Sequence, residues 1–551
     1  MRLSTLFPML VLLSVLPCQA AVNRPILKWQ YGGCYPSWCE RGWYSSPAVA
    51  DLDEDGTMEV IGSAYSIAVL DGRTGSLEWR VGSGHDRSEP ASYEHRTWPG
   101  IEVVDVDNDG HLEIITAHSG GFVSVYDRDG YFKPGWPRRP TDNELRGLVV
   151  YDLDGDGKAE IIVTGATYGK TNTWVFAHDG TPRSGWPQLA DSSGYAYGVF
   201  NDNCWVDDLD GDHRAELIVP SDVHYICAYD DGGSQLPAHS MYGGRSWGGV
   251  GVWESMVPEL RGWGDCSSSR EERYRANFAH GASVVSDLDG DGSREIVTVG
   301  NMYDCANGHP PGKYNAVFIF NADRSRFAAN GWDWSAPPTD TGAPLSEDYN
   351  IIENCQPNPV VADLDNDGTR EILHPSYDGR MHAFWLDKTE HHNWPYAVYN
   401  SGEGVYRFAS EPVVADLDRD GCAEVIFTSW PQKSSSTLLL GKVHILDCRG
   451  TPLHEIDLPA PKSGSQTWNG GLAAPTIANI DDDADLELVI NTTASGFVAY
   501  DLPGTARATV LWRSGRNRGL RSTGTSGHST TPQQPGRFSL PPLLHPLLGT
   551  P

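Results

Sequence analysis

DLDEDGTME at residues 51–59 is the first of eight acidic nine-residue segments in this 551-residue chain. The other seven are DVDNDGHLE (105–113), DLDGDGKAE (152–160), DLDGDHRAE (208–216), DLDGDGSRE (287–295), DLDNDGTRE (363–371), DLDRDGCAE (416–424) and NIDDDADLE (479–487). Their starts lie 47 to 79 residues apart. Recurrence at such distances is typical of repeat proteins, in which each copy builds one structural unit.

Short apolar runs flank each acidic segment, as PAVADL (47–52) and EVIGSA (59–64) flank the first. A third run follows (SIAVLD, 66–71), and a fourth, weaker run often carries Trp (LEWR, 77–80; VLWR, 510–513). These runs predict four strands per copy. A small sheet cannot bury both of its faces alone, whereas a ring of such sheets can. We therefore expect an all-β fold, a β-propeller of eight four-stranded blades, with seven blades as the alternative. Residues 27–31 are expected to join the last blade or to cap the ring.

The acidic segments are predicted to be cation-binding loops. Positions 1, 3 and 5 are Asp (Asn479 in the last copy), position 9 is always Glu, and position 7 varies so widely that its backbone carbonyl is the expected ligand. Position 2 is always apolar and is expected in the core, and position 6 is Gly except for His213 and Ala484, which fits a sharp turn. The candidate metal ligands are Asp51, Asp53, Asp55, Thr57, Glu59, Asp105, Asp107, Asp109, His111, Glu113, Asp152, Asp154, Asp156, Lys158, Glu160, Asp208, Asp210, Asp212, Arg214, Glu216, Asp287, Asp289, Asp291, Ser293, Glu295, Asp363, Asp365, Asp367, Thr369, Glu371, Asp416, Asp418, Asp420, Cys422, Glu424, Asn479, Asp481, Asp483, Asp485 and Glu487.

The donor set points to calcium. Three carboxylates, a carbonyl and a Glu that can bind through both oxygens suit a hard cation that takes roughly six to eight oxygen ligands. No His or Cys recurs at a ligand position, which argues against zinc. A solvated acidic turn could explain one copy, but clustered carboxylates repel one another unless a cation neutralises them. We expect about one Ca²⁺ per loop, up to eight in all.

Loops and flanking strands together resemble the FG-GAP/VCBS repeat family, the calcium-loop repeats of integrin α-subunit propellers and of bacterial secreted proteins. GWP at 135–137 and 185–187 resembles the bacterial members. The resemblance covers about residues 27–523. The FG and GAP sequence motifs themselves are mostly missing, and Ala474-Pro475 is the segment most similar to GAP. It implies a propeller, calcium at positions 1, 3, 5, 7 and 9, and a role in adhesion or carbohydrate binding.

The ends of the chain and its cysteines indicate a secreted protein. Residues 1–20 read as a signal peptide, residues 21–523 as the propeller and residues 524–551 as a disordered tail rich in Pro, Ser and Gly. Cys34 with Cys39, Cys266 with Cys305, and Cys422 with Cys448 are plausible disulfides, with buried thiols as the alternative. The net charge of −32 argues against nucleic acid binding, and no segment after the signal could enter a membrane. We expect a monomer.

Segments that enter each first strand are expected on the face opposite the calcium loops, and they are rich in aromatic and basic residues. We predict a binding or adhesion function there for carbohydrate or protein ligands, with packing between blades as the alternative role for any one side chain. A calcium-dependent lyase acting on acidic polysaccharide is the alternative function, in which a histidine near an arginine serves as the base. The candidate ligand-binding residues are His95, Arg96, Trp98, Arg146, Trp205, Arg275, His280, Tyr406 and Arg407.

Overall fold

The computed structural model of the chain describes residues 22–32, 42, 44–63, 65–91, 96–165, 171–188, 204–220, 225–251, 283–301, 315–335, 338, 345, 357–433, 436–462 and 467–517. The predicted signal peptide, the predicted tail and four of the cysteines named above (34, 39, 266 and 305) lie outside these residues. None of the helices in the described part of the chain has the length and apolar character needed to cross a bilayer.

The first repeat shows how each acidic segment is used. Strands β2 (Ala48–Ala50), β3 (Glu59–Ser63), β4 (Ser66–Asp71) and β5 (Leu77–Gly82) pair in chain order as an antiparallel sheet. The acidic segment 51–59 forms the loop from the first strand to the second. Every residue of β3 is buried, because other sheets cover both faces of this one.

The same order recurs in seven more sheets of the described chain, which we number 2 to 8 along the sequence, the sheet above being sheet 1. Their strands are β6 (Glu102–Val104), β7 (Glu113–Ala117) and β8 (Val123–Tyr126); β9 (Leu145–Tyr151), β10 (Glu160–Gly165) and β11 (Thr173–Phe176); β12 (Trp205–Asp207), β13 (Glu216–Pro220) and β14 (Ile226–Tyr229); β15 (Ser283–Ser286), β16 (Glu295–Asn301) and β17 (Asn315–Asn321); β18 (Val360–Ala362), β19 (Glu371–Ser376), β20 (Arg380–Phe384) and β21 (Tyr396–Ala397); β23 (Val413–Asp416), β24 (Glu424–Pro431), β26 (Lys442–Leu446) and β27 (Pro452–Asp457); and β29 (Thr476–Ala478), β30 (Leu486–Thr492) and β31 (Gly496–Leu502).

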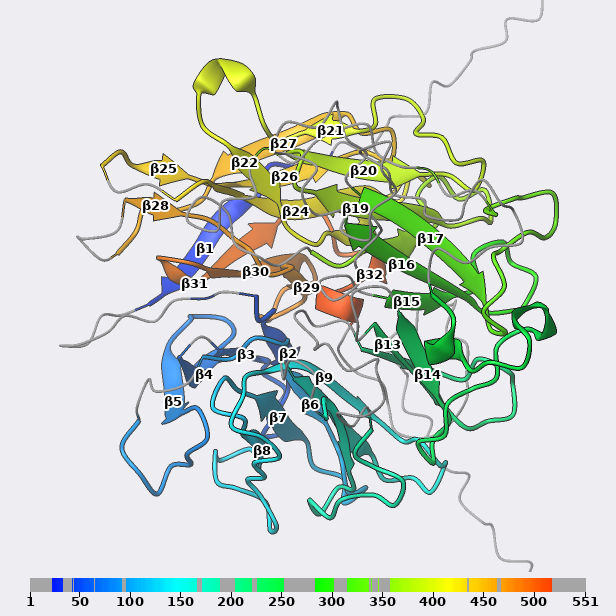
Figure 1. The fold of residues 1–551 in the computed structure, drawn as a ribbon. Helices are drawn as coiled ribbons and strands as arrows, with labels where there is room; N and C mark the ends of the chain where they lie inside the picture. The colour runs from blue at the N-terminus through cyan, green and yellow to red at the C-terminus, as the bar shows by residue number, and fades with distance from the viewer. Residues whose placement is uncertain are drawn as a thin grey trace, which may run out of the picture.

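The remaining elements are short. β22 (Arg407–Ala409) pairs with β24, and β25 (Leu439–Leu440) lies parallel to β28 (Trp468–Asn469). Four 3-10 turns complete the described elements: η2 (Ser240–Tyr242), η3 (Trp247–Gly249), η6 (Ser401–Glu403) and η7 (Gly515–Asn517). The fold is therefore all-β, as predicted, with small sheets of propeller type arranged around the centre of the molecule (Figure 1).

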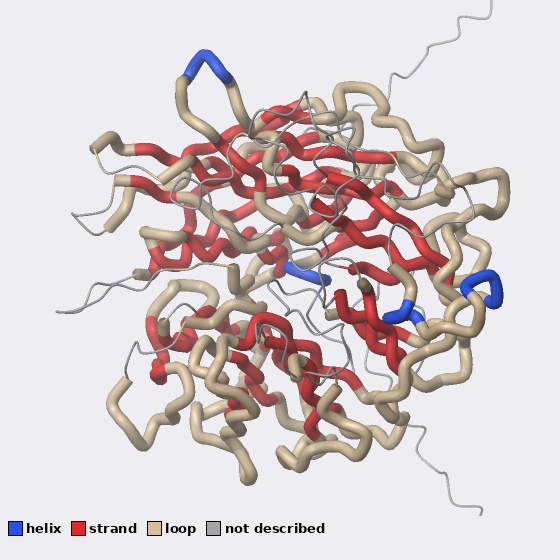
Figure 2. Tube along the Cα trace, in the orientation of Figure 1, coloured by secondary structure: helices blue, strands red, loops and turns tan. Residues whose placement is uncertain are grey.

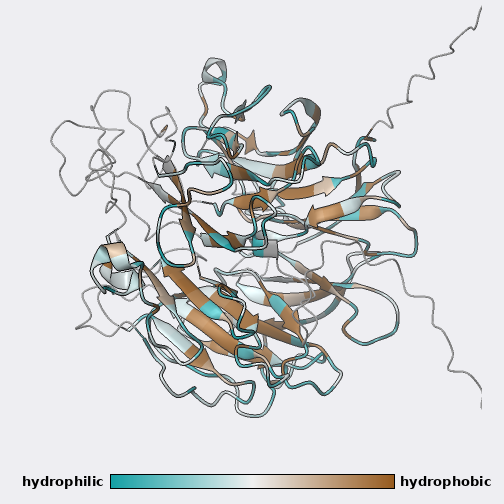
Figure 3. Cartoon of the chain, turned by 90° about the vertical axis from the view of Figure 1, so that its right-hand side faces the viewer, coloured by the Kyte–Doolittle hydropathy of each residue, from teal (hydrophilic) through white to brown (hydrophobic). Residues whose placement is uncertain are grey.

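Apolar side chains are concentrated on the strands. Figure 3 shows the strands mostly in hydrophobic colours and the connecting loops mostly in hydrophilic ones. The residues at loop position 2 are buried, as predicted, in every sheet: Leu52, Val106, Leu153, Leu209, Leu288, Leu364, Leu417 and Ile480.

A continuous fourth strand is absent from the described parts of sheets 2 to 5, where four strands were predicted. Isolated bridges such as Val123 with Arg138 and Phe176 with Pro182 stand in its place. Proline explains part of this difference, because Pro137 and Pro187 follow the Trp of each GWP and have no N–H to donate to a strand ladder.

The tryptophans of these segments connect neighbouring sheets. Trp79 of sheet 1 donates its indole N–H to the carbonyl of Arg128 in sheet 2 (3.2 Å), and Trp136 of sheet 2 donates to His178 in sheet 3 (2.9 Å). The acceptor always lies in the turn after the third strand. Gly130 lies in one such turn with a φ of 82°. A Cβ at this position would lie only 2.9 Å from the Trp79 ring, so the close approach of the indole requires glycine. The same bond is made by Trp186 to Asp231, Trp247 to Ala322, Trp334 to Leu386, Trp394 to Cys448 and Trp29 to Gly72.

The N-terminal strand completes the last sheet. β1 (Ile26–Tyr31) pairs antiparallel with β31, so of the two expected roles for residues 27–31, joining the last repeat is the one observed. The Trp29 bond to Gly72 then connects sheet 8 to sheet 1.

The C-terminal strand takes a different place from the one predicted. VLWR (510–513) was expected as the fourth strand of the last sheet, but β1 already occupies that edge of β31. β32 (Thr509–Trp512) pairs instead with β23, the first strand of sheet 7. Trp512 stacks against Trp205 of sheet 4, with ring centroids 6.1 Å apart.

The residues after β32 connect several sheets. The guanidinium of Arg516 donates to the carbonyls of Cys204 (2.6 Å) and Ser283 (3.0 Å), and its backbone N–H donates to Glu411 Oε1 (2.6 Å). η7, which contains Arg516, lies in the middle of the molecule in Figures 1 and 2. The C-terminal segment therefore bridges first strands of different sheets at the centre of the fold.

Replacing Trp512 with Ala is expected to lower the free energy of unfolding by about 3–5 kcal/mol, as for other buried tryptophans. Its neighbour Leu511 is 37% exposed and Trp512 only 4%, so Leu511→Ala is the matched control, with an expected loss below about 1 kcal/mol. Urea unfolding monitored by circular dichroism measures both. Equal losses in the two variants would show that β32 does not hold the centre together.

Candidate metal centres

Each acidic loop is folded by hydrogen bonds to its own carboxylates. In the first loop, the N–H of Gly56 donates to Asp51 Oδ2 (3.1 Å), and the N–H of Thr57 donates to Asp55 Oδ1 (2.7 Å). The bond from position 7 to position 5 is present in all eight loops, and the bond from position 6 to position 1 is present in the first seven. The carboxylates are thereby held together at one end of each sheet.

Two positions in the loop need a left-handed backbone. Position 6 has a positive φ in the first seven loops, such as 87° at Gly56, which confirms the sharp turn predicted from its glycines. His213 adopts φ 71° at that position, a conformation that a residue other than Gly takes at some cost. Position 4 also has a positive φ in these loops, for example 63° at Glu54 and 60° at Asn108, which the sequence analysis did not anticipate.

The glutamate at position 9 is buried beneath the three aspartates. Its Oε2 accepts the backbone N–H of position 2 at 2.7–3.0 Å in all eight loops, which fixes the carboxylate. Its Oε1 stays available for another partner. In Glu371 and in Glu487 this oxygen is buried and has no hydrogen-bond partner in the structure. Such an orphaned buried oxygen fits a cation ligand, since a buried acceptor without a partner is costly.

The carboxylates also destabilise one another's charge. Burial, together with the neighbouring aspartates, raises the pKa of Glu371 and of Glu424 to about 8. The same causes raise the pKa of Glu59, Glu216 and Glu295 to about 7. A bound cation would stabilise the ionised form of each group.

The oxygen atoms of several loops converge closely enough for one ion. In the loops that begin at 51, 105, 152, 208 and 287, one ligand atom from each of three carboxylates lies within 4.8 Å of the other two. All of these donors are carboxylate oxygens, a set that matches a hard cation such as Ca²⁺ better than a softer metal. These loops could therefore each hold a metal ion.

The eighth loop has a different geometry. Asn479 Nδ2 donates to the carbonyl of Asp483 (2.7 Å), and the N–H of Asp481 donates to Asn479 Oδ1 (3.1 Å). Neither Asp482 nor Ala484 has the positive φ of positions 4 and 6 elsewhere. The two residues that distinguish this copy in the sequence thus account for part of the difference: Asn479 changes the hydrogen bonds of the loop, and Ala484 lacks the left-handed backbone of the glycines.

Three basic residues that sequence reasoning missed reach into these loops. Lys28, Lys133 and Arg183 form ion pairs with ligand carboxylates of the loops in sheets 8, 2 and 3. The only sequence feature that could have predicted these ion pairs is the position of the three residues on or near the fourth strand of their repeats. One contact of a loop residue was predicted from the sequence: Cys422, at position 7, forms a disulfide with Cys448.

The predicted ligand-face residues lie in separate groups. The guanidinium carbons of Arg96 and Arg146 lie 4.8 and 4.0 Å from the ring centroid of Trp98, and both arginines pair with Glu144. Trp98 is only 4% exposed.

Trp205 is only 6% exposed and packs on Trp512, as described above. Tyr406 is half-buried, and Arg407 pairs with Glu403 (2.8 Å). His95, Arg275 and His280 lie outside the described residues. The binding role of all these residues remains a prediction.

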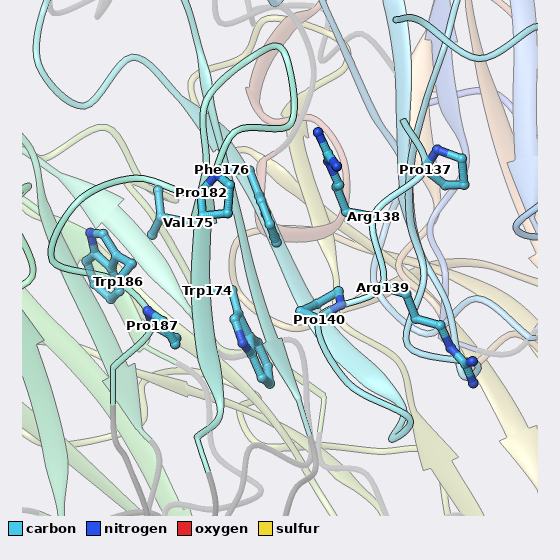
Figure 4. Close-up of a pocket in the computed structure, with 10 residues that line it drawn as sticks. All are labelled: Pro137, Arg138, Arg139, Pro140, Trp174, Val175, Phe176, Pro182, Trp186 and Pro187. Carbon is cyan, nitrogen blue, oxygen red and sulfur yellow. The ribbon is translucent and has the colours of Figure 1, made fainter. Parts of the chain in front are cut away.

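A pocket of about 480 Å³ lies between sheets 2 and 3 (Figure 4). Trp174 and Phe176 alternate along β11 and project toward the segment 137–140, which carries Arg138 and Pro140. Trp174 is half-buried, so part of its ring reaches solvent. Sequence reasoning assigned GWP and the third strand to the repeat and so did not single out this pocket.

Comparisons with known proteins agree with the repeat architecture. The family of FG-GAP-like repeats matches residues 105–163, which contain the second and third acidic loops. No curated protein matches the chain.

Several solved structures resemble the chain at low identity. The V. cholerae biofilm matrix protein Bap1 is 13% identical, with 89% of this chain and 92% of that chain covered and a TM-score of 0.46. The exotype rhamnogalacturonan lyase YesX is 15% identical, with 87% and 75% covered and a TM-score of 0.49. Sqt1 of Saccharomyces cerevisiae is 9% identical, with 86% and 100% covered and a TM-score of 0.48. Likeness at this level carries no argument about activity. The family match shows an FG-GAP-like repeat at residues 105–163, and the hydrogen bonds of its acidic loops recur in the other loops.

Proposed function

We propose that this chain is a secreted, calcium-stabilised β-propeller of eight blades that acts as a binding or adhesion module for carbohydrate or protein ligands. The observation that carries the binding function is the aromatic pocket between sheets 2 and 3. The blade count is supported by eight sheets of one topology and by tryptophan bonds from sheet to sheet, including the one from sheet 8 to sheet 1. A closed ring gives binding residues a rigid scaffold.

Calcium is the proposed cofactor of the acidic loops, with up to one ion in each. The side chains at positions 1, 3, 5 and 9 and the carbonyl at position 7 are the proposed ligands. The bound ion would supply the positive charge that lets the clustered carboxylates ionise together. The residues of the chain orient those carboxylates through the backbone N–H groups of positions 2, 6 and 7.

An extracellular location is proposed from two features. The first 20 residues have the charge and apolar pattern of a signal peptide. The Cys422–Cys448 disulfide suits an oxidising compartment.

The pocket has the chemistry of a site for an acidic sugar or a carboxylate-bearing peptide. A half-exposed indole can stack on a sugar ring, and a guanidinium can pair with a carboxylate. Trp174 and Arg138 supply these two groups from different sheets. Arg138 Nε is buried and has no hydrogen-bond partner in the structure, which leaves a donor for a ligand. A local pair of arginines on a chain of net charge −32 also favours an anionic ligand over a cationic one.

Removing calcium is expected to lower the melting temperature. Each ion bound only by the folded state adds about 2.7 kcal/mol when its free concentration is about 100 times Kd. Scanning calorimetry with and without a chelator, together with elemental analysis, measures this effect. Calcium should restore the melting temperature and magnesium should not, because Mg²⁺ demands a tighter octahedral geometry. An unchanged melting temperature with no metal found would contradict the proposal.

The chelated protein is expected to lose stability as the pH rises from about 5 to 8. The pKa of Glu371 is raised from 4.5 to about 8 in the fold, so between these values the folded state keeps a proton that the unfolded state has lost. This contribution is complete at the low end of the window and disappears as the pH passes through 8. Glu371→Gln should flatten the dependence and Glu54→Gln, outside the ligand positions, should not. Thermal unfolding at each pH in chelator tests this, and a slope unaffected by Glu371→Gln would disprove it.

Trp174→Ala is expected to weaken ligand binding by about tenfold or more, because stacking on one aromatic ring contributes about 1 kcal/mol or more. Trp332→Ala removes another half-buried tryptophan and should leave binding unchanged. A glycan array, followed by titration calorimetry on the strongest ligand, measures both. Arg138→Gln should weaken acidic ligands selectively. Equal affinity of the wild type and Trp174→Ala would remove the pocket from the proposal.

A further inference from the structure

One position on the fourth segment of the repeat recurs next to the acidic loop of the same sheet. In sheet 2 this residue is Lys133, whose N–H donates to Val125 of the third strand (2.9 Å). Arg183, Leu236 and Phe327 make the equivalent bond in sheets 3, 4 and 5, at 2.9–3.0 Å. We call this the facing position.

In sheets with a regular fourth strand, the facing position coincides with an irregularity in the strand ladder. In the strand pairs β1–β31, β5–β4 and β27–β26, the register shifts so that one residue of the fourth strand has no partner opposite it. The residue that the ladder skips is Lys28 in sheet 8, Glu78 in sheet 1 and Leu453 in sheet 7. Residues of very different charge thus occupy one structural position.

Basic residues at the facing position enter the loop. Lys133 Nζ lies 2.8 Å from Glu113 Oε1, 3.0 Å from Asp107 Oδ2 and 3.3 Å from Asp109 Oδ2. Although burial alone would lower it, these hydrogen bonds raise the pKa of Lys133, so the ammonium stays charged.

The two other basic residues make matching contacts. Arg183 lies 2.8 Å from Glu160 Oε1 and 2.9 Å from Asp154 Oδ2. Lys28 hydrogen-bonds Asp481 but lies 3.6 Å from Glu487 Oε1, so its contact with the Glu is an ion pair without a hydrogen bond.

These are the same oxygen atoms that a metal would need. Lys133 contacts ligand positions 3, 5 and 9, and the Glu oxygen that it contacts is the one that the backbone leaves available. A calcium ion binds oxygens at roughly 2.3–2.6 Å, so it cannot share them with an ammonium that already sits among them. The side chain also neutralises one unit of the charge that would attract the ion.

In the described residues of the other five loops, no Lys or Arg side chain sits among the ligand carboxylates. Arg370 acts on Asp287 and Asp363, and Arg73 acts on Asp55, only over a longer distance. The ion pairs in this part of the chain join no Lys or Arg to positions 1, 3, 5 or 9 of the loops that begin at 51, 208, 287, 363 and 416.

The facing residues Leu236, Phe327 and Leu453 are apolar. In sheet 6 the equivalent residue is His391, whose carbonyl accepts the N–H of Trp394 as that of Lys133 accepts the N–H of Trp136. The imidazole of His391 pairs with Asp387, outside the loop. In sheet 1, Glu78 adds a further carboxylate, since Asp53 and Asp55 contribute, after burial, to the raised pKa of Glu78.

We propose that the facing position decides which loops bind calcium: the loops of sheets 2, 3 and 8 carry their own cation in Lys133, Arg183 and Lys28, and the loops of sheets 1, 4, 5, 6 and 7 take the metal. This inference rests on the proposed calcium binding and narrows it from eight possible sites to five. It makes the fold of three sheets independent of external calcium.

The number of calcium ions per chain tests the proposal. The full-length protein is stripped with a chelator, reloaded in excess calcium, freed of unbound ion and measured by native mass spectrometry and elemental analysis. The wild type is expected to hold five ions. Lys133→Leu copies the residue of sheets 4 and 7 and should raise the count to six. Leu453→Lys copies the residue of sheet 2 and should lower it to four, with Leu453→Met as the control that stays at five.

The possible ion counts distinguish the role of the facing position from the proposed calcium binding as a whole. Eight ions in the wild type, or a count unchanged by both charge substitutions, would overturn the role of the facing position and leave calcium binding intact. No ions at all would instead contradict the proposed calcium function. Leu453 is 39% exposed, so Leu453→Lys decides the question even if Lys133→Leu does not fold.

Discussion

Repulsion among carboxylates is the constraint around which this protein is built. Each repeat turns its chain between the first and second strands by means of side-chain oxygens that accept the loop's own N–H groups, as Asp51 and Glu59 do in the first loop. This loop structure brings three or four carboxylates together and places one of them, the glutamate at position 9, in the core. Desolvated carboxylates in contact are strongly destabilised unless a positive charge or a proton neutralises them. Basic side chains lie among these oxygens in sheets 2, 3 and 8, and a metal ion is the proposed source of charge in the other sheets.

A second interaction converts separate sheets into one body. In every described sheet except sheet 7, a buried indole of the fourth segment donates its N–H to a carbonyl in a turn of the next sheet, as Trp136 does to His178. The bond tolerates different backbones around it, since Trp79 lies in a regular strand while Trp136 lies in an irregular segment before a proline. Sheet 7 has no tryptophan in its fourth strand PLHEID, and there the C-terminal strand β32 provides the extra contact by pairing with β23.

Much of this could be predicted from the sequence because it is periodic. The acidic loop, the apolar position 2 and the glycine at position 6 recur in register, so local chemistry alone indicates the strands, the turn and the carboxylates that converge in each loop. The place of VLWR could not be predicted in this way, because its pattern fits a fourth strand and only the prior occupation of that edge by β1 excludes it. Trp98 and Trp205 illustrate a second limit, since an aromatic residue before a strand gives the same signal whether it is exposed to ligand or packed under an arginine. Lys133 illustrates a third, because a lysine outside the motif shows its partner only when the sheet is folded.

The variable residue at position 7 links the two interactions. Sequence variety suggested that only its carbonyl matters, yet its side chain in several sheets holds the turn that accepts the neighbouring tryptophan. Cys422 is bonded to Cys448, the acceptor of Trp394, and Arg214 pairs with Asp231, the acceptor of Trp186. Lys158 Nζ lies 3.3 Å from His178 Nε2, and the carbonyl of His178 accepts Trp136. A covalent bond, an ion pair and a polar contact thus serve one purpose at equivalent sites. The side chain at position 7 can therefore differ in chemistry from sheet to sheet, because each version only has to contact the turn that accepts the neighbouring tryptophan.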